Sequence, residues 1–104
     1  MAKYIIISKL TDEGAKTLKK NPGRVKEVNV ELKDMGVNVL DQYAVLGNFD
    51  FLTIVEADDE TTIAKAIVEI ASRGSIKTAT YTAIPIDEFI DDFLKIDLKR
   101  LQKQ

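Results

Sequence analysis

The 104-residue chain contains no histidine, no cysteine and no tryptophan. Without histidine and cysteine it cannot build a Ser-His-Asp or Cys-His nucleophile, a Cys/His zinc site, an iron–sulfur cluster or a haem held by either residue. Disulfides are excluded as well, so thiols give no information on the redox compartment. We therefore expect no metal site and no cofactor.

An excess of one charge is also lacking, since 15 basic and 17 acidic side chains leave a formal charge of −2. This balance does not favour nucleic-acid binding, which needs a basic surface. No apolar run approaches the roughly 20 residues that span a bilayer. We expect neither a nucleic acid nor a membrane as partner, and a cytoplasmic location by default. The length and the 45% apolar content predict one domain over residues 1–104.

The spacing of apolar residues predicts alternating strands and helices. Isoleucine-rich residues 3–9 indicate a strand, and a stripe at three- and four-residue spacing indicates a helix from Asn21-Pro22 to Gly36. The alternation of Val28, Val30 and Leu32 is a rival strand signal in that segment. Further strands are predicted at residues 37–45, 49–57 and 75–84, and further helices after Thr11, after Asp58-Asp59-Glu60 and at about 87–101. This order is that of an α+β ferredoxin-like βαββαβ two-layer sandwich with an extra C-terminal helix.

The pair Gly47-Asn48 between two strand-like segments predicts a two-residue hairpin loop with a type II′ turn, because glycine accepts the positive φ this turn requires. The resulting register divides the hairpin into two faces. The face expected under the helices holds Leu40, Gln42, Ala44, Leu46, Phe49, Phe51, Thr53 and Val55. The opposite face holds Val39, Asp41, Tyr43, Val45, Asp50, Leu52, Ile54 and Glu56.

This opposite face is too apolar to be left in water. Together with the isoleucines of the first strand it would expose a patch of roughly several hundred Å², which monomers rarely do. A second copy of the same sheet is the simplest cover, so we expect an obligate homo-oligomer, a dimer at minimum. The C-terminal helix folded back over its own sheet is the rival cover.

Four residues are candidates for a binding site. Asp50 follows the tight turn beside aliphatic neighbours, where a carboxylate can orient a ligand or act as a general base. Its alternative role is to accept hydrogen bonds from amides and fix the hairpin. Tyr43 shares that face, and Thr78 and Thr80 alternate along the last strand. Plain packing for the tyrosine and a plain sheet surface for the threonines are the alternatives.

Several short segments together resemble the GYD domain family. They are Thr11-Asp12-Glu13-Gly14, Asn21-Pro22-x-Arg24, Leu46-Gly47-Asn48-Phe49-Asp50, Val55-Glu56-Ala57 and Gly74-x-x-Lys77-Thr78-x-Thr80. In the motif that names the family Gly47 and Asp50 are present, and Phe49 stands in place of the tyrosine. The resemblance extends from Tyr4 to about Phe93. It implies a dimeric α+β barrel, in which two ferredoxin-like sheets pack face to face.

Three functions stay open on this basis. We favour a small-molecule-binding or interaction module that uses the cleft between the paired sheets. One alternative is a cofactor-independent enzyme with Asp50 and Tyr43 in acid–base roles, and another is a purely structural assembly protein. The expected partners are a second copy of the chain and a small molecule that the sequence does not identify.

Overall fold

A computed structural model describes the backbone of residues 1–102 and the side chains of residues 1–95. It contains four strands and four helices in this part of the chain. The order is β1 (Ala2–Leu10), α1 (Asp12–Lys20), α2 (Arg24–Asp34), β2 (Asn38–Ala44), β3 (Phe51–Ala57), α3 (Glu60–Ala71), β4 (Ile76–Ala83) and α4 (Ile86–Gln102).

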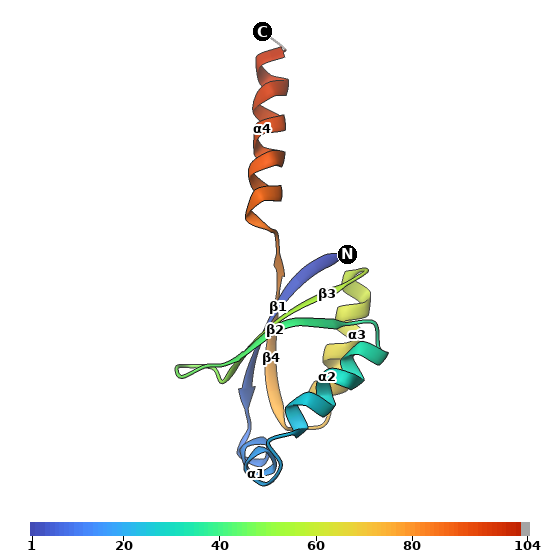
Figure 1. The fold of residues 1–104 in the computed structure, drawn as a ribbon, viewed down its shortest axis with the longest axis vertical. Coiled ribbons are helices and arrows are strands. Elements are labelled where there is room, and N and C mark those ends of the chain that lie inside the picture. The colour runs from blue at the N-terminus through green and yellow to red at the C-terminus, as the bar shows by residue number, and fades with distance from the viewer. Residues whose placement is uncertain (103–104) are drawn as a thin grey trace.

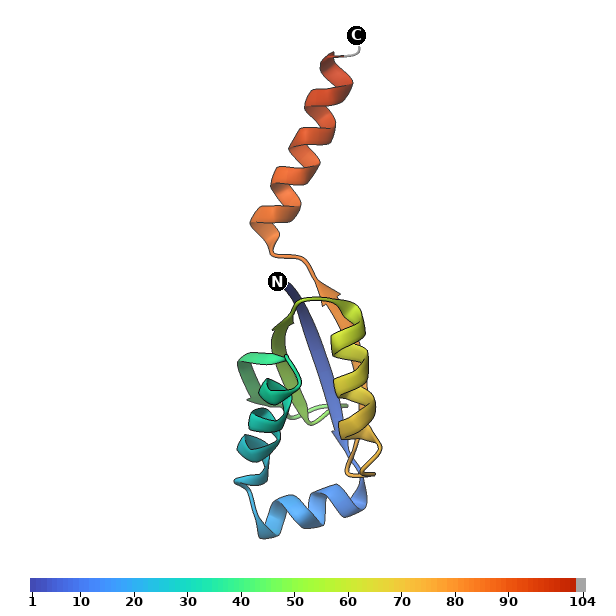
Figure 2. The same ribbon diagram turned by 90° about the vertical axis from the view of Figure 1, so that its right-hand side faces the viewer.

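The four strands form one antiparallel sheet in the order β2-β3-β1-β4. Helices α2 and α3 cover one face of it, α1 closes one end, and the other face carries no helix (Figures 1 and 2). The core between the layers contains Tyr4, Ile6, Val55, Ile63 and Ile70, each at most 7% exposed. The predicted α+β ferredoxin-like sandwich with an additional C-terminal helix is confirmed.

Local signals explain where the helices begin and end. The Thr11 side chain accepts a hydrogen bond from Gly14 N–H at the start of α1, and Asp59 caps α3 through Thr62 N–H. Helix α2 ends in a Schellman motif, with Gly36 at φ +88°. The predicted start of this helix at Asn21-Pro22 is wrong. That pair forms a turn after α1, and α2 starts at Arg24 without a side-chain cap.

The predicted type II′ turn at Gly47-Asn48 is also wrong. Among the described residues positive φ angles occur only at Gly36 and Gly74, so residues 45–50 form a wider irregular loop. The reason lies in β1, which pairs with this loop: Asp50 N–H donates to the Ser8 carbonyl at 2.9 Å. The expected pairing of Tyr43 with Leu52 is nevertheless present.

An irregularity in β2 corrects the predicted faces. The pairing with β3 shifts between Val39 and Asp41, so Leu40 is an extra residue in a β-bulge. Val39 consequently lies opposite buried Val55 and packs against the core, although it was expected on the open face. Leu40, expected under the helices, is instead 41% exposed.

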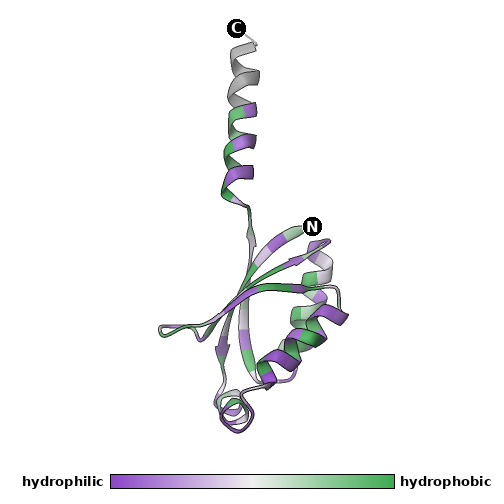
Figure 3. Ribbon diagram, viewed as in Figure 1, coloured by the Kyte–Doolittle hydropathy of each residue, from purple (hydrophilic) through white to green (hydrophobic). Residues whose placement is uncertain are grey.

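Helix α4 extends away from the sheet and lengthens the molecule to 64 Å (Figures 1 and 3). It does not fold back over its own sheet, so the rival cover for the open face is excluded. Its exposed apolar side chains include Ile86, Phe89, Ile90, Phe93 and Leu94. In the described part of the chain, no helix has both the length and the apolar character needed to cross a membrane.

Candidate functional site

Asp50 lies in the loop between β2 and β3 and is bound to the end of β1. Its Oδ2 accepts a hydrogen bond from Leu10 N–H at 2.8 Å, while its own N–H donates to the Ser8 carbonyl. Its carbonyl accepts from Val45 N–H at 2.8 Å. Asp50 therefore joins the hairpin loop to the first strand, which is the contact expected of the hairpin-fixing alternative.

The structure does not bring the four predicted site residues together. Tyr43 pairs with Leu52 on the open face and is 56% exposed. Thr78 and Thr80 pair with Ser8 and Ile6, whose side chains are buried on the face under the helices. The tyrosine and the two threonines are consequently separated by the thickness of the sheet.

The open face is apolar in consecutive rows across the sheet. Tyr43, Leu52, Ile7 and Ala79 form one row, and Asp41, Ile54, Ile5 and Tyr81 form the next. The isoleucines and Leu52 are only half-buried, and Tyr81 is 54% exposed. An antiparallel sheet that faced water on this side would carry polar residues here.

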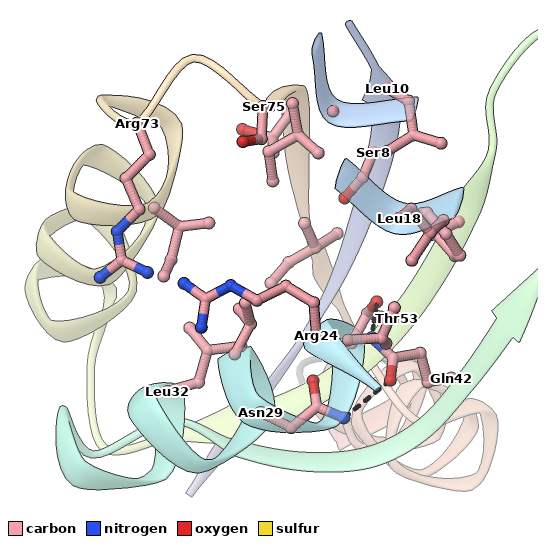
Figure 4. A pocket seen from close by; sticks show the side chains of 18 of the residues that line it. Ser8, Leu10, Leu18, Arg24, Asn29, Leu32, Gln42, Thr53, Arg73 and Ser75 are labelled. Carbon is pink, nitrogen blue, oxygen red and sulfur yellow. Dashed lines mark hydrogen bonds between the residues drawn. The ribbon is translucent and has the colours of Figure 1, made fainter. Parts of the chain in front are cut away.

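A cavity of about 150 Å³ lies on the covered side, between the sheet and helices α1, α2 and α3 (Figure 4). Its walls are mainly apolar, with Leu18 from α1, Val28 from α2 and Ile67 from α3. Ser8, Phe51 and Thr78 contribute from the strands. We predicted a binding cleft between two paired sheets, whereas this cavity lies inside one chain beneath its helices.

A line of polar side chains crosses one wall of this cavity. Asn29 donates through Nδ2 to Gln42 Oε1 at 2.7 Å, and Gln42 donates through Nε2 to Thr53 Oγ1 at 3.2 Å (Figure 4). Asn29 Oδ1 is buried and has no hydrogen-bond partner within the described residues. If both amides were turned over, Asn29 would present an unpaired Nδ2 instead, so one polar atom stays unpaired in either orientation.

An ion-pair network stands at the rim of the cavity, where α2 meets the end of α3. Glu31 binds both Arg24, at 3.3 Å, and Arg73, while Arg24 also pairs with Glu27 and Arg73 with Glu69. The hydrogen bond from Arg73, together with the charges of both arginines, lowers the pKa of the Glu31 carboxyl. The same hydrogen bond raises the pKa of Arg73. Both rim arginines are therefore already neutralised.

The first turn of α1 is fixed against the loop before β4. Thr11 N–H donates to the Ser75 carbonyl at 3.0 Å, and the Thr11 hydroxyl donates to the Gly74 carbonyl at 2.8 Å. A Cβ at Gly14 would lie only 2.0 Å from the Ser75 oxygen. Glycine is thus required because the two backbones touch, which explains its place in the Thr11–Gly14 segment.

Two more pKa shifts occur at the start of α3. Hydrogen bonds from the Thr62 N–H and hydroxyl lower the pKa of the Asp59 carboxyl. Burial raises the pKa of Tyr4, and the charges of Glu60 and Asp59 act in the same direction. Since Tyr4 is only 3% exposed, its phenol belongs to the core.

Sequence reasoning missed most of the cavity residues. Ser8 was a signal in the sequence, because it directly follows three isoleucines at a position where an aliphatic residue fits the strand pattern. Asn29 lies on helix α2 and Arg73 in the turn after α3, where polar residues are usual, and nothing in the sequence distinguished them. Their convergence depends on the tertiary arrangement of α2 and α3.

Comparisons with known proteins agree with this fold. A family model described as "GYD domain" matches residues 4–91. A protein of Thermus thermophilus named "Glutamine synthetase and cystathionine beta-lyase binding protein" is 56% identical over 91 residues, which cover 86% of this chain and 96% of that protein.

Two solved structures are similar as well. FFRP-DM1 has a TM-score of 0.55 and 27% identity, covering 81% of this chain and 100% of its own. A hypothetical protein of Pyrococcus horikoshii, PHS023, has a TM-score of 0.54 and 26% identity, covering 82% of this chain and 92% of its own. The similarities confirm the resemblance read from the short sequence segments.

Proposed function

This chain belongs to the GYD domain family, and on that basis we propose that it is a homo-oligomeric protein-binding module that docks on metabolic enzymes in the cytoplasm. The observation that carries the proposal is the 56% identity over 96% of a protein named for binding glutamine synthetase and cystathionine beta-lyase. The partners we propose for this chain are these same two enzymes. Binding of this kind needs an exposed surface rather than a catalytic group.

The open sheet face is the surface we assign to self-association. Its rows of Ile5, Ile7, Leu52 and Ile54 carry no helix, and the two tyrosines Tyr43 and Tyr81 border them. Tyrosine combines a large apolar area with a hydroxyl, which suits it to interfaces. A second copy presents the same apolar rows, so two copies cover each other in a twofold dimer.

Helix α4 is the surface we assign to enzyme docking. Ile86, Phe89, Ile90 and Phe93 stand at positions i, i+3, i+4 and i+7, and each is at least 46% exposed. An amphipathic helix with anchors at this spacing can lie in an apolar groove of a partner. Phe89 and Phe93 stack with their ring centroids 6.3 Å apart, so the apolar side of α4 has two adjacent aromatic rings at its centre.

Enzyme docking is tested by biolayer interferometry with purified glutamine synthetase and cystathionine beta-lyase from the same organism. The wild type is expected to bind at least one of them saturably. Phe89→Glu/Phe93→Glu should lose binding, while Glu88→Ala, on the opposite side of α4 by helical spacing, should retain it. No saturable binding by the wild type at about 10 μM, well above typical specific affinities, would overturn the proposal.

Self-association is tested by light scattering on Leu52→Lys. The wild type should run as a dimer, and the lysine should give monomers or aggregates because it places a charge in the apolar seam. Val30→Lys is the matched control, because Val30 is an exposed aliphatic residue on α2 and lies outside the open face. A well-folded wild-type monomer at micromolar concentration contradicts this assignment.

A further inference from the structure

The cavity between the sheet and helices α1, α2 and α3 contains hydrogen-bonding groups that the fold leaves unused. Ser8 is only 7% exposed, and the hydrogen bonds among the described residues include none from its hydroxyl, whose oxygen is not fully buried and opens on the cavity. Figure 4 shows this hydroxyl directed among the side chains that line the cavity. Thr78 pairs with Ser8 across β1 and β4, so its side chain lies on the same face, and it also lines the cavity.

A hydroxyl that opens on a mainly apolar cavity finds few hydrogen-bond partners there besides water and a bound molecule. Ser8 directly follows the three isoleucines of β1, at a position where an aliphatic residue would fit the strand pattern. Thr78 adds a second hydroxyl beside it. The pair therefore forms a polar patch on the floor of the cavity, apart from Gln42 and Thr53, which bond to each other.

The charges around the cavity restrict what can enter. Arg24 and Arg73 are the charged residues in its lining, and both are held by Glu31 at the rim. An anion would have to displace this carboxylate, and a cation would meet two arginines. Burial of an unpaired ion is strongly unfavourable, so the lining favours an uncharged occupant.

The size of the cavity restricts the occupant further. A cavity of about 150 Å³ accommodates a molecule of about the size of benzene. We infer that this cavity is a binding site for a small uncharged molecule with an apolar body of that size and one hydroxyl or amide group, which bonds to Ser8 and Thr78. The inference is independent of enzyme docking, because no residue of α4 or of the open sheet face lines this cavity.

The site is tested with phenol, benzene and benzoate as probes, using NMR titrations of the full-length protein. Phenol should shift amide signals of α1, β1 and β4 and saturate with a dissociation constant on the order of 1 mM, as befits so few atoms. It should bind about fivefold more tightly than benzene, which corresponds to one net hydrogen bond. Benzoate, which is charged at neutral pH, should not bind.

Variants of the two hydroxyl residues separate this site from general apolar binding. Ser8→Ala/Thr78→Val should remove the preference for phenol over benzene and keep benzene binding. Thr80→Val is the matched control, because Thr80 lies two residues away on the same strand and lines a different hollow. This control should keep the fivefold preference.

Three results would overturn the inference. The first is that phenol does not saturate the protein up to about 20 mM, far above the expected dissociation constant. The others are that benzoate binds as tightly as phenol, or that the double variant still prefers phenol over benzene. Loss of dimerisation or of enzyme binding in other variants leaves it untouched, so it fails separately from the proposed function.

Discussion

The two faces of the sheet are both apolar at their centres, whereas an antiparallel sheet in a monomeric sandwich has one apolar and one polar face. The face under the helices holds Ser8, Gln42, Thr53 and Thr78 among its apolar residues. The face without a helix holds isoleucine, leucine and tyrosine at its centre, with charged residues such as Lys3, Glu56 and Lys77 towards its ends. In a monomer the polar residues would face water and the aliphatic ones the core.

The difference shows that the two faces meet different requirements. The open face needs a cover that the chain itself does not supply, because α4 points away from it (Figure 1). The covered face lies under α2 and α3, which together with α1 and the sheet enclose a cavity with hydroxyls on its floor. We therefore propose self-association on one side of the four strands and small-molecule binding on the other.

The largest effect is expected from Ile6→Ala on the covered face. Ile6 is 4% exposed, and its truncation should cost about 3 kcal/mol of the free energy of unfolding by leaving a cavity. Urea denaturation measures this loss of stability. The dimer dissociation constant of Ile6→Ala should equal that of the wild type. Ile5→Ala, one residue away on the open face, should instead weaken the dimer in sedimentation experiments. The distinction between the two faces is contradicted if Ile6→Ala and Ile5→Ala change the free energy of unfolding and the dimer dissociation constant in the same way.

A smaller effect is expected where α1 is held at the end of the sheet. Gly14→Ala should cost about 2 kcal/mol, because the new methyl group pushes against the Ser75 carbonyl and moves the helix that closes the cavity. Gly47→Ala is the control, since nothing lies within 4 Å of a Cβ there. Its effect should stay within about 0.5 kcal/mol. Equal thermal stability of the two variants would contradict the close contact.

Asp50 joins the hairpin to β1 at the end of the sheet, where neither face is involved. Asp50→Ala should cost about 1.5 kcal/mol, because Leu10 N–H loses a charged acceptor. Asp50→Asn keeps an oxygen at that place and should cost less. Hydrogen exchange at the Leu10 amide reports the contact directly, and it should be faster in Asp50→Ala. An unchanged exchange rate would show that the loop holds without this carboxylate.

Much of the fold could be predicted because the signals that determine it are local. The 3.6-residue stripe of α2 outweighed the strand-like alternation of Val28, Val30 and Leu32, and the structure confirms a helix there. The loop at Gly47 and the bulge at Leu40 could not be predicted in the same way. Both depend on pairing with neighbouring strands, β1 for the loop and β3 for the bulge.

The candidate sites depended even more on tertiary structure. Ser8, Asn29 and Thr78 come from three different elements, and only their packing together creates the cavity. The open face, in contrast, was visible in the sequence, because Leu52 and Ile54 alternate regularly with buried neighbours. An alternation with a period of two residues can be read from a short stretch of sequence, whereas a cavity lined by seven helices and strands cannot.

The smallest effect concerns the ionic rim of the covered face. The hydrogen bond from Arg73 lowers the pKa of Glu31 in the folded protein below its unfolded value, so this carboxylate stabilises the fold at neutral pH. The stabilisation is lost as the pH falls from the unfolded value of about 4.3 through the lower folded value. The melting temperature of the wild type should therefore fall further between pH 7 and pH 3 than that of Glu31→Gln. Asp34→Asn, exposed on the same helix and outside the network, should behave like the wild type. If the melting temperature of Glu31→Gln falls as far as that of the wild type, the ion pairs at the rim do not contribute measurably to stability. Apolar packing alone then holds α2 and α3 on the covered face.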